Sequence, residues 1–423
     1  MSLNNYQSNF DKLLEHHKGS SNFNLGREKA FARFIKMGFP NKKMEGWRFT
    51  DFSSLINTNY KIQLEEKNKG NFDSSFLENE LDGVDTLVFY NGHYQKDLSS
   101  IPKKTKITYK SHQRKEIFSH SKISEQTPFD LLNKAFSSKS FSLEVKPNIN
   151  LEKPIRLLFI SSGKNSTMSN PRIFLKIGSS SSATLLEHHV GDAKNFFQNC
   201  SMFTLLEKNA GLDYIKVQKN SAKTKNVFNY NVDQGKDSFF SFSQFLQGSQ
   251  LTRTNLNVKL NDENASCSIS SLSLTDEKRH NDDFIVVNHK HSNCNSSQLF
   301  KNILQDQSSG VFTGKTIVSK QAQKTDSSQY NKNLLLSKSS HMNSNPQLEI
   351  HADDVKCSHG STTGELDLDA LFYLRSRGLN SRQATSLLVR GFAEECFNKI
   401  KIKTLSLHIK NIFNGWIKEK GLN

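Results

Sequence analysis

Cys357 and His359 stand two residues apart in LEIHADDVKCSHGSTTG, the segment from Leu348 to Gly364. The segment reads as a β-strand, in which residues i and i+2 point to the same side. A thiol and an imidazole on one side suit iron, zinc or an iron–sulfur cluster. Two donors cannot close a four-coordinate site, so further ligands must come from elsewhere in the fold or from a second chain. The alternative is a buried cysteine beside a hydrogen-bonded histidine, because one C-x-H motif is weaker than paired C-x-x-C motifs.

A second group of metal-competent residues is His289, His291 and Cys294 in the run HKHSNC. The two histidines would share one side of a strand, which allows a mononuclear metal site, but the spacing favours hydrogen-bonded structural histidines. The neighbours His188 and His189 would point to opposite faces of a strand, which argues against shared chelation.

The composition indicates a soluble and rather polar protein. The chain has 423 residues, of which 35% are hydrophobic, and its mean hydropathy is −0.61. No run of about 18 apolar residues occurs, so we expect no transmembrane helix. The N-terminal sequence lacks the apolar centre of a secretory signal, so we expect a cytoplasmic protein. Five cysteines are scattered singly, which predicts reduced thiols, most of them small core residues.

The net charge of +16 allows binding to nucleic acid, to an anionic membrane surface or to an acidic partner. The lysines are dispersed rather than gathered in a basic tail. The sequence contains no zinc finger, RNP signature or helix-turn-helix pattern. Charge alone therefore assigns no function.

Residues 1–140 are expected to form a mixed, largely helical region. The run from Asn24 to Met37 has apolar residues near helical spacing and is followed by helix-stopping residues. Another helix is predicted to begin near Thr127, because Thr127 can cap it and Pro128 suits its first turn. Trp47 lies in the run NKKMEGWRFTDFSSL among further aromatic residues, and we interpret this group as an aromatic cluster that seats the N-terminal segment.

Residues 141–364 read almost entirely as strands. Short apolar runs are broken by Gly, Asn, Ser and Asp clusters that supply turns. Leu256, Val258 and Leu260 are expected on one face, and Asn257 and Lys259 on the other. A large antiparallel sandwich or barrel and a β-solenoid both fit this pattern. The spacing drifts, so periodicity does not choose between them, although the polar strands and Asn/Ser-rich turns favour the solenoid.

Residues 365–423 switch to helix. The first predicted helix ends at Gly378, in the position of a C-terminal cap. Asn380 and Gln383 form a capping-box pattern at the start of the next. The last helix carries an apolar stripe that includes Phe413 and Trp416. About 60 residues are too few for an independent core, so these helices must dock on the strands, on each other or on a partner.

The C-terminal part of the sequence resembles a known family. The segment NPQLEIHADDVKCSHGSTTGELDLDALFYLRSRGLNSRQATSLLVRGFAEE is similar to the C-terminal signature of the SufB/SufD family, core components of the SUF machinery for iron–sulfur cluster assembly. The preceding stretch from Phe284 resembles the same family. The run MEGWRFTDF and the chain length favour the SufD branch. Where the family usually has SHGATVG, this chain has SHGSTTG, which leaves Cys357, His359 and Gly364 intact.

The resemblance implies a right-handed parallel β-helix between an N-terminal helical region and C-terminal helices. It also implies the partners: a SufB subunit paired along the β-helices, and the ATPase SufC carried on the C-terminal helices. The helices from Asp367 to Ile400 are the expected docking region for SufC, with contacts from Leu371, Phe372 and Tyr373. For Leu371 and Phe372, packing within the core of the chain is the preferred interpretation. The sequence leaves open a homodimer when SufB is absent.

The resemblance further implies a role for the first motif. His359, and with it Cys357, would belong to the SufB interface where a transient iron–sulfur cluster is built and shared. The chain itself would be a non-catalytic scaffold. It contains no G-x-x-x-x-G-K-[ST] motif, so we expect it to bind no nucleotide and ATP hydrolysis to belong to SufC.

The alternative function is a basic β-solenoid that binds nucleic acid or polysaccharide. A nucleic-acid binder needs a concentrated basic face, and a polysaccharide-active solenoid needs clustered acids or a calcium site along a groove. Neither pattern stands out in the sequence, so the scaffold interpretation is preferred.

Overall fold

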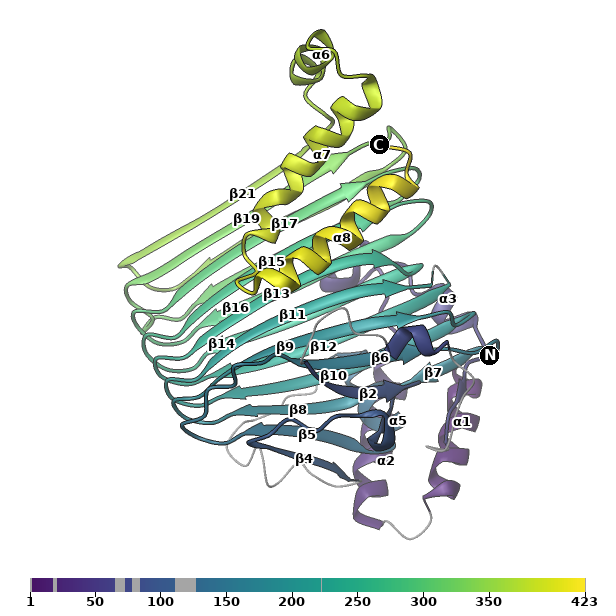
Figure 1. The fold of residues 1–423 in the computed structure, drawn as a ribbon. Coiled ribbons are helices and arrows are strands. Elements are labelled where there is room, and N and C mark those ends of the chain that lie inside the picture. Colours follow the sequence, from purple (N-terminus) through teal and green to yellow (C-terminus); the bar gives the residue numbers. More distant parts are fainter. Residues whose placement is uncertain are drawn as a thin grey trace.

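The chain forms a parallel β-helix in a computed structural model (Figure 1). The structure describes residues 2–17, 21–64, 73–77, 84–110, 127–221 and 223–422. From β8 (Arg172–Ile177) to the last strand, β21 (Val355–Gly364), successive strands alternate between two sheets. The first sheet contains, in spatial order, β20 (His341–Ile350), β18 (Ser309–Val318), β16 (His280–His289), β14 (Leu251–Leu260), β12 (Thr224–Gln234), β10 (Phe196–Leu206), β8 (Arg172–Ile177), β5 (Ser140–Val145) and β4 (Thr105–Lys110), with β7 (Thr167–Ser169) and β1 (Lys61–Ile62) at its side.

The second sheet lies opposite the first and has the same stacked order. It contains β21 (Val355–Gly364), β19 (Thr325–Leu335), β17 (Asn295–Leu304), β15 (Ser266–Thr275), β13 (Phe239–Gly248), β11 (Gly211–Asn220), β9 (Ser182–Gly191), β6 (Ile155–Ser161), β2 (Asp85–Tyr90) and β3 (His93–Gln95). Strands β2, β3 and β4, which precede residue 140, are therefore members of the two sheets. They lie at the N-terminal end of the β-helix. The solenoid expected from the sequence is confirmed.

Each turn of the helix stacks in parallel on the next. Leu251 of β14 pairs with His280 of β16, and His280 pairs with Ser309 of β18, a spacing of 29 residues. The spacing is shorter, 26 residues, between β12 and β14 and longer between β18 and β20. This variation explains why no strict repeat is visible in the sequence.

One corner of the β-helix repeats the same backbone conformation from turn to turn. Asn209, Asp237 and Asn264 occupy the same corner in successive turns, each with φ of +57°. Asn and Asp tolerate this left-handed conformation better than most residues. The backbone N–H of Asn209 donates to the carbonyl of Lys236 in the next turn (2.8 Å), so the corners are hydrogen-bonded in register with the sheets.

The inner faces of the two sheets meet in one elongated apolar core. Leu256, Val258 and Leu260 point into it, while Lys259 on the outer face approaches Asp233 (Nζ–Oδ1 3.7 Å). The predicted alternation of β14 is therefore confirmed. Four of the five cysteines are buried and Cys357 is partly exposed.

The N-terminal helices cover the outer face of the first sheet. They are α1 (Ser2–His16), α2 (Ser21–Met37), α3 (Ser53–Asn57) and α5 (Pro128–Phe136), together with the short η1 (Glu45–Trp47). Their apolar residues pack on Phe197, Val227 and Leu251 of that sheet. Thr127 caps α5 in a capping box with Asp130, which confirms the predicted start of this helix.

The aromatic run around Trp47 fixes this region to the β-helix. Trp47 packs against Phe52, with ring centroids 5.4 Å apart, and the guanidinium of Arg253 lies 4.2 Å from the Trp47 ring centroid. Arg253 also forms a buried ion pair with Asp282, and Thr50 donates to the same carboxylate. The prediction that this cluster seats the N-terminal segment is confirmed.

The C-terminal helices lie on the opposite side of the molecule (Figure 1). Helices α7 (Ser381–Phe397) and α8 (Lys403–Glu419) pack their apolar stripes on the outer face of the second sheet. Asn380 and Gln383 form the predicted capping box. Helix α6 (Leu368–Ser376) projects beyond the end of the β-helix and has no buried residue. Two short 3-10 turns, η2 (Ser74–Leu77) and η3 (Lys96–Leu98), complete the described helices, none of which is long and apolar enough to cross a membrane.

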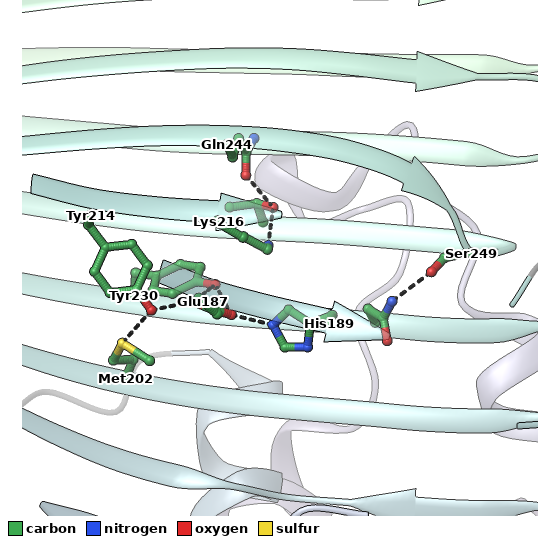
Figure 2. A network of polar contacts seen from close by, with 10 residues as sticks. Glu187, His189, Met202, Tyr214, Lys216, Tyr230, Gln244 and Ser249 are labelled. Atoms are coloured by element: carbon green, nitrogen blue, oxygen red, sulfur yellow. Dashed lines mark hydrogen bonds and ion pairs between the residues drawn. The ribbon is translucent and has the colours of Figure 1, made fainter. Parts of the chain in front are cut away.

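One layer of the core is polar (Figure 2). The carboxylate of Glu187 accepts hydrogen bonds from the hydroxyls of Tyr214 and Tyr230 and from the ring of His189. The Nζ of Lys216 lies 3.4 Å from the Phe228 ring centroid. All of these side chains are buried. A polar network inside a core is stable only when its members satisfy one another.

The network continues into the next turns and shifts the pKa values of its members. Gln244 donates to Asp283 (Nε2–Oδ1 2.8 Å), and burial raises the pKa of Asp283 to about 6. Burial lowers the pKa of Lys216 to about 8. Burial also acts to raise the pKa of Glu187, but His189 and Lys216 hold it below its ordinary value.

We expect Lys216→Met to change the pH dependence of stability. Lys216 has a pKa of about 8 when folded and 10.5 ordinarily, so below pH 8 folding carries the full cost of burying the ammonium. That cost disappears as the pH rises from about 8 to about 10.5. The unfolding free energy of the wild type should therefore rise relative to that of the variant across this window.

Denaturant unfolding at pH 7 and at pH 10 measures this difference. Lys259→Met, on the outer face of β14, controls for the loss of one lysine from the chain. The prediction would be contradicted if the difference in unfolding free energy between wild type and Lys216→Met were the same at both pH values.

Candidate functional site at the open end of the β-helix

The C-terminal end of the β-helix is open. Strand β20 pairs only with β18, and β21 pairs only with β19, within the described ranges. Neither terminal strand has a buried residue, whereas every strand from β8 to β19 has several. The outer edges of β20 and β21 therefore present rows of backbone N–H and C=O groups that no described strand pairs.

Cys357 and His359 lie on β21, on the side that faces the inside of the helix. Cys357 pairs in register with Ser327 and His359 with Gln329. Both partners are fully buried inside the solenoid. Because residues i and i+2 of a strand share a face, the thiol and the imidazole extend two inner rows of side chains to the last turn. The predicted strand and shared face are confirmed.

The two donors differ in their surroundings. Cys357 is half-buried and packs on a small apolar group that includes Val318, Ala322 and Ala352. This burial, together with the charge of Asp326, raises the pKa of the Cys357 thiol. A thiol with a raised pKa is mostly protonated at neutral pH, and it ligates a metal only as the metal displaces its proton. The His359 side chain is exposed and so is accessible from outside.

The described residues do not by themselves complete a metal site. No group of three or more His, Cys, Asp or Glu side chains that could hold a metal ion occurs in the described part of the chain. The other side chains of the last turn near these donors include the hydroxyl of Ser361, which donates to Ser344 across the open end (2.8 Å), and the apolar side chains of Val355 and Met342. Cys357 and His359 thus offer two donors, and a four-coordinate metal needs further ligands from a second molecule.

The second His/Cys group does not converge. His289 is buried at the end of β16 and hydrogen-bonds Ser296 through Nε2 (2.8 Å), and burial lowers its pKa to about 4. His291 is exposed in the following turn. The thiol of Cys294 donates to the carbonyl of Asp262 (3.2 Å).

The adjacent histidines on β9 point to opposite faces of the sheet, as predicted. His189 belongs to the inner network around Glu187. His188 lies on the outer face, where its Nδ1 accepts from Arg156 (3.0 Å). The charged residues inside the core were not predicted from the sequence. Their signal is a charged residue, such as Glu187 or Lys216, within an otherwise apolar strand.

Helix α6 follows β21 directly, after residues 365–367. Its surface is apolar and exposed: Leu368 is 73% exposed, Phe372 74% and Tyr373 56%. Packing of Phe372 within the chain, one of the two sequence interpretations, is wrong, because α6 lies beyond the sheet and packs mainly on α7. Leu371 is half-buried. Exposed aromatic side chains of this size are typical of protein interaction sites.

Comparison with known proteins agrees with the geometry. Residues 159–392 match the family described as the SUF system FeS cluster assembly SufBD core domain. Residues 2–157 match the SufBD protein N-terminal region.

The relatives with curated descriptions include iron-sulfur cluster assembly protein SufD of Escherichia coli, which is 30% identical over 89% of both chains. An iron-sulfur cluster assembly SufBD family protein of Synechocystis is 31% identical over 86% of this chain and 85% of its own. The chloroplastic protein ABCI7 of Arabidopsis thaliana is 28% identical over 63% of this chain and 58% of its own. This chain therefore belongs to the SufBD family of the SUF system for iron–sulfur cluster assembly, in which it is similar to SufD over most of its length.

Proposed function

We propose that this chain is a non-catalytic scaffold subunit on which the SUF system builds a nascent iron–sulfur cluster. The observation that carries the proposal is the position of Cys357 and His359. They are two metal donors on the terminal turn of an open β-helix, with no third donor nearby among the described residues. The cluster is the cargo of this site rather than a resident cofactor, since only part of its ligand set comes from this chain.

The open edge supports a partner that is itself a β-helix. Strands β20 and β21 are each ten residues long, and alternate residues of each direct backbone N–H and C=O groups to the outside. A strand added to each sheet would satisfy these groups. A SufB subunit, with the same kind of fold, would continue both sheets and bring the missing ligands to Cys357 and His359. A second copy of this chain could pair with the same edge when SufB is absent, but it would supply only the same two donor types.

The exposed face of α6 supports docking of the ATPase SufC. Leu368, Phe372 and Tyr373 are exposed on a helix that projects beyond the end of the β-helix (Figure 1). Aromatic residues in such a surface commonly contribute most of the binding energy of an interface. The chain has no Walker motif, so in this proposal nucleotide binding and hydrolysis belong to SufC.

The path from α6 to the donors is short. Residues 365–367 join α6 to β21, and α7 is held to the neighbouring strands by Glu395. This carboxylate contacts Lys301 of β17 (2.7 Å) and Lys332 of β19 (3.6 Å). Movement of docked SufC subunits on ATP binding would act on α6 and α7, and through these contacts on the last turn. Such a change requires that the nucleotide-bound SufC dimer bind the altered arrangement more tightly than the resting one.

His359→Ala tests the role of the imidazole. The variant would be co-expressed with SufB and SufC, purified without oxygen, and analysed for subunit ratio, iron and acid-labile sulfide. We expect an intact complex that has lost most of its iron and sulfide, because one ligand of the shared site is missing.

His351→Ala is the matched control. His351 is also an exposed histidine at the end of the β-helix, but it pairs with Glu349 (3.1 Å) and lies before β21. This variant should keep its cluster content. A full cluster load in His359→Ala would assign the histidine a structural role, and failure of the wild-type subunits to assemble would contradict the scaffold proposal.

Phe372→Ala tests the docking of SufC. Removal of an exposed aromatic anchor from an interface commonly costs about 2 kcal/mol or more, which is over tenfold in affinity. We expect that loss in SufC binding, measured by calorimetry with the purified chain, and no change in thermal stability, because Phe372 is 74% exposed.

Phe49→Ala is the control for that experiment, since Phe49 is a 46% exposed phenylalanine in the N-terminal region. It should leave SufC binding unchanged. Equal binding of SufC by wild type and Phe372→Ala would exclude this face of α6 as the docking site.

A further inference from the structure

A cavity of about 600 Å³ lies between the outer face of the second sheet and helix α8, away from the open end. Its wall on the β-helix is formed by Arg156 of β6, His188 of β9 and Lys219 of β11, and its wall on α8 includes His408. The volume is within the range of small-molecule sites. The cavity thus lies where α8 and the second sheet, which share an apolar cluster, leave a space between them.

The β-helix side of the cavity is basic. Arg156, only 3% exposed, donates through Nη2 to Nδ1 of His188 (3.0 Å). Since Nδ1 accepts this bond, the neutral ring carries its proton on Nε2 and is a second donor. The His188 ring lies edge-on to that of His408, with centroids 5.8 Å apart. Lys219 is exposed on the same wall and forms no ion pair with the described residues.

Most carboxylates that line the cavity lie at its other end and form ion pairs with neighbouring basic side chains. The carboxylate of Asp276 contacts Arg279 and Lys420, the latter at 2.5 Å, and accepts from the indole of Trp416 (3.2 Å). Glu277 contacts Arg279 (3.3 Å). Glu419, near the end of α8, is the remaining carboxylate among the lining residues.

The charges around His188 agree with a basic side of the cavity that is separate from the carboxylates. Burial lowers the pKa of His188, and the nearby cations Arg156 and Lys219 lower it further, as does His408. An anion in the basic half of the cavity would reduce the repulsion among these groups and accept their hydrogen bonds.

We propose that this cavity binds a small oxyanion of the phosphate class, held by Arg156, His188 and Lys219 from the β-helix and by His408 from α8. The donors fit the chemistry, because a guanidinium, an ammonium and imidazole N–H groups all donate to phosphate oxygens. A bound anion would connect α8 to the β-helix by polar contacts and so stabilise the docked position of the C-terminal helices. This site is independent of the cluster site on β21.

The experiment uses the purified full-length chain. Thermal unfolding is followed with added inorganic phosphate, with adenosine monophosphate, or with chloride at equal ionic strength. We expect phosphate to raise the unfolding midpoint more than chloride does, because a ligand that binds only the folded chain stabilises it. Hydrogen exchange in α8 should slow on phosphate addition. Tighter binding of the nucleotide than of phosphate would identify a phosphate monoester as the ligand, and equal binding would identify phosphate itself.

Lys219→Ala and His408→Gln test the site, and Lys36→Ala on α2 controls for the loss of a surface lysine. Lys219 and Lys36 are both exposed, so neither lysine replacement should prevent folding. We expect Lys219→Ala to weaken phosphate binding about tenfold, as for the loss of one charge-assisted hydrogen bond, and Lys36→Ala to have no effect. The proposal is overturned if phosphate stabilises the wild type no more than chloride does, or if Lys219→Ala responds as the wild type does.

Discussion

The hydrogen-bonded stacking of each turn on the next is the constraint on which this structure depends. An inner strand such as β16 has its backbone groups satisfied by β14 on one side and β18 on the other. The N-terminal turns end with antiparallel strands, β3 against β2 and β4 against β5. The last turn has no such cover among the described elements, so the repeat that builds the core also creates an unpaired edge at β20 and β21.

The helices are placed so that this edge stays free. The N-terminal helices use the outer face of one sheet, and α7 and α8 use the outer face of the other. The N-terminal helices pack beside β10, β12 and β14, and among the described helices only α6 reaches past the open C-terminal end (Figure 1). A partner on α6 and a partner on the edge would therefore lie next to each other and share a short connection of residues 365–367.

Local signals in the sequence predicted the elements better than their arrangement. The caps at Thr127 and Asn380 and the alternation of β14 were predictable because each depends on residues close in the chain. The period of the solenoid could not be predicted, because the number of residues per turn varies from one turn to the next. Inner polar residues such as Glu187 and Lys216 were also missed, because their partners come from neighbouring turns. The interpretation of Phe372 depended on whether α6 has a surface to pack on, which is a property of the whole fold.

The position of the donors within the inner rows explains why such a site belongs at the end of the β-helix. The row of Cys357 continues inward through Ser327 and Ser296, and that of His359 through Gln329 and Gln298. Inside the helix these side chains are buried and hydrogen-bond one another, as Gln329 does to Gln298 (3.1 Å). A thiol or an imidazole there would be closed off from a metal ion. At the last turn the same rows are open to the outside. A donor placed there can bind a metal ion for which a second chain supplies further ligands.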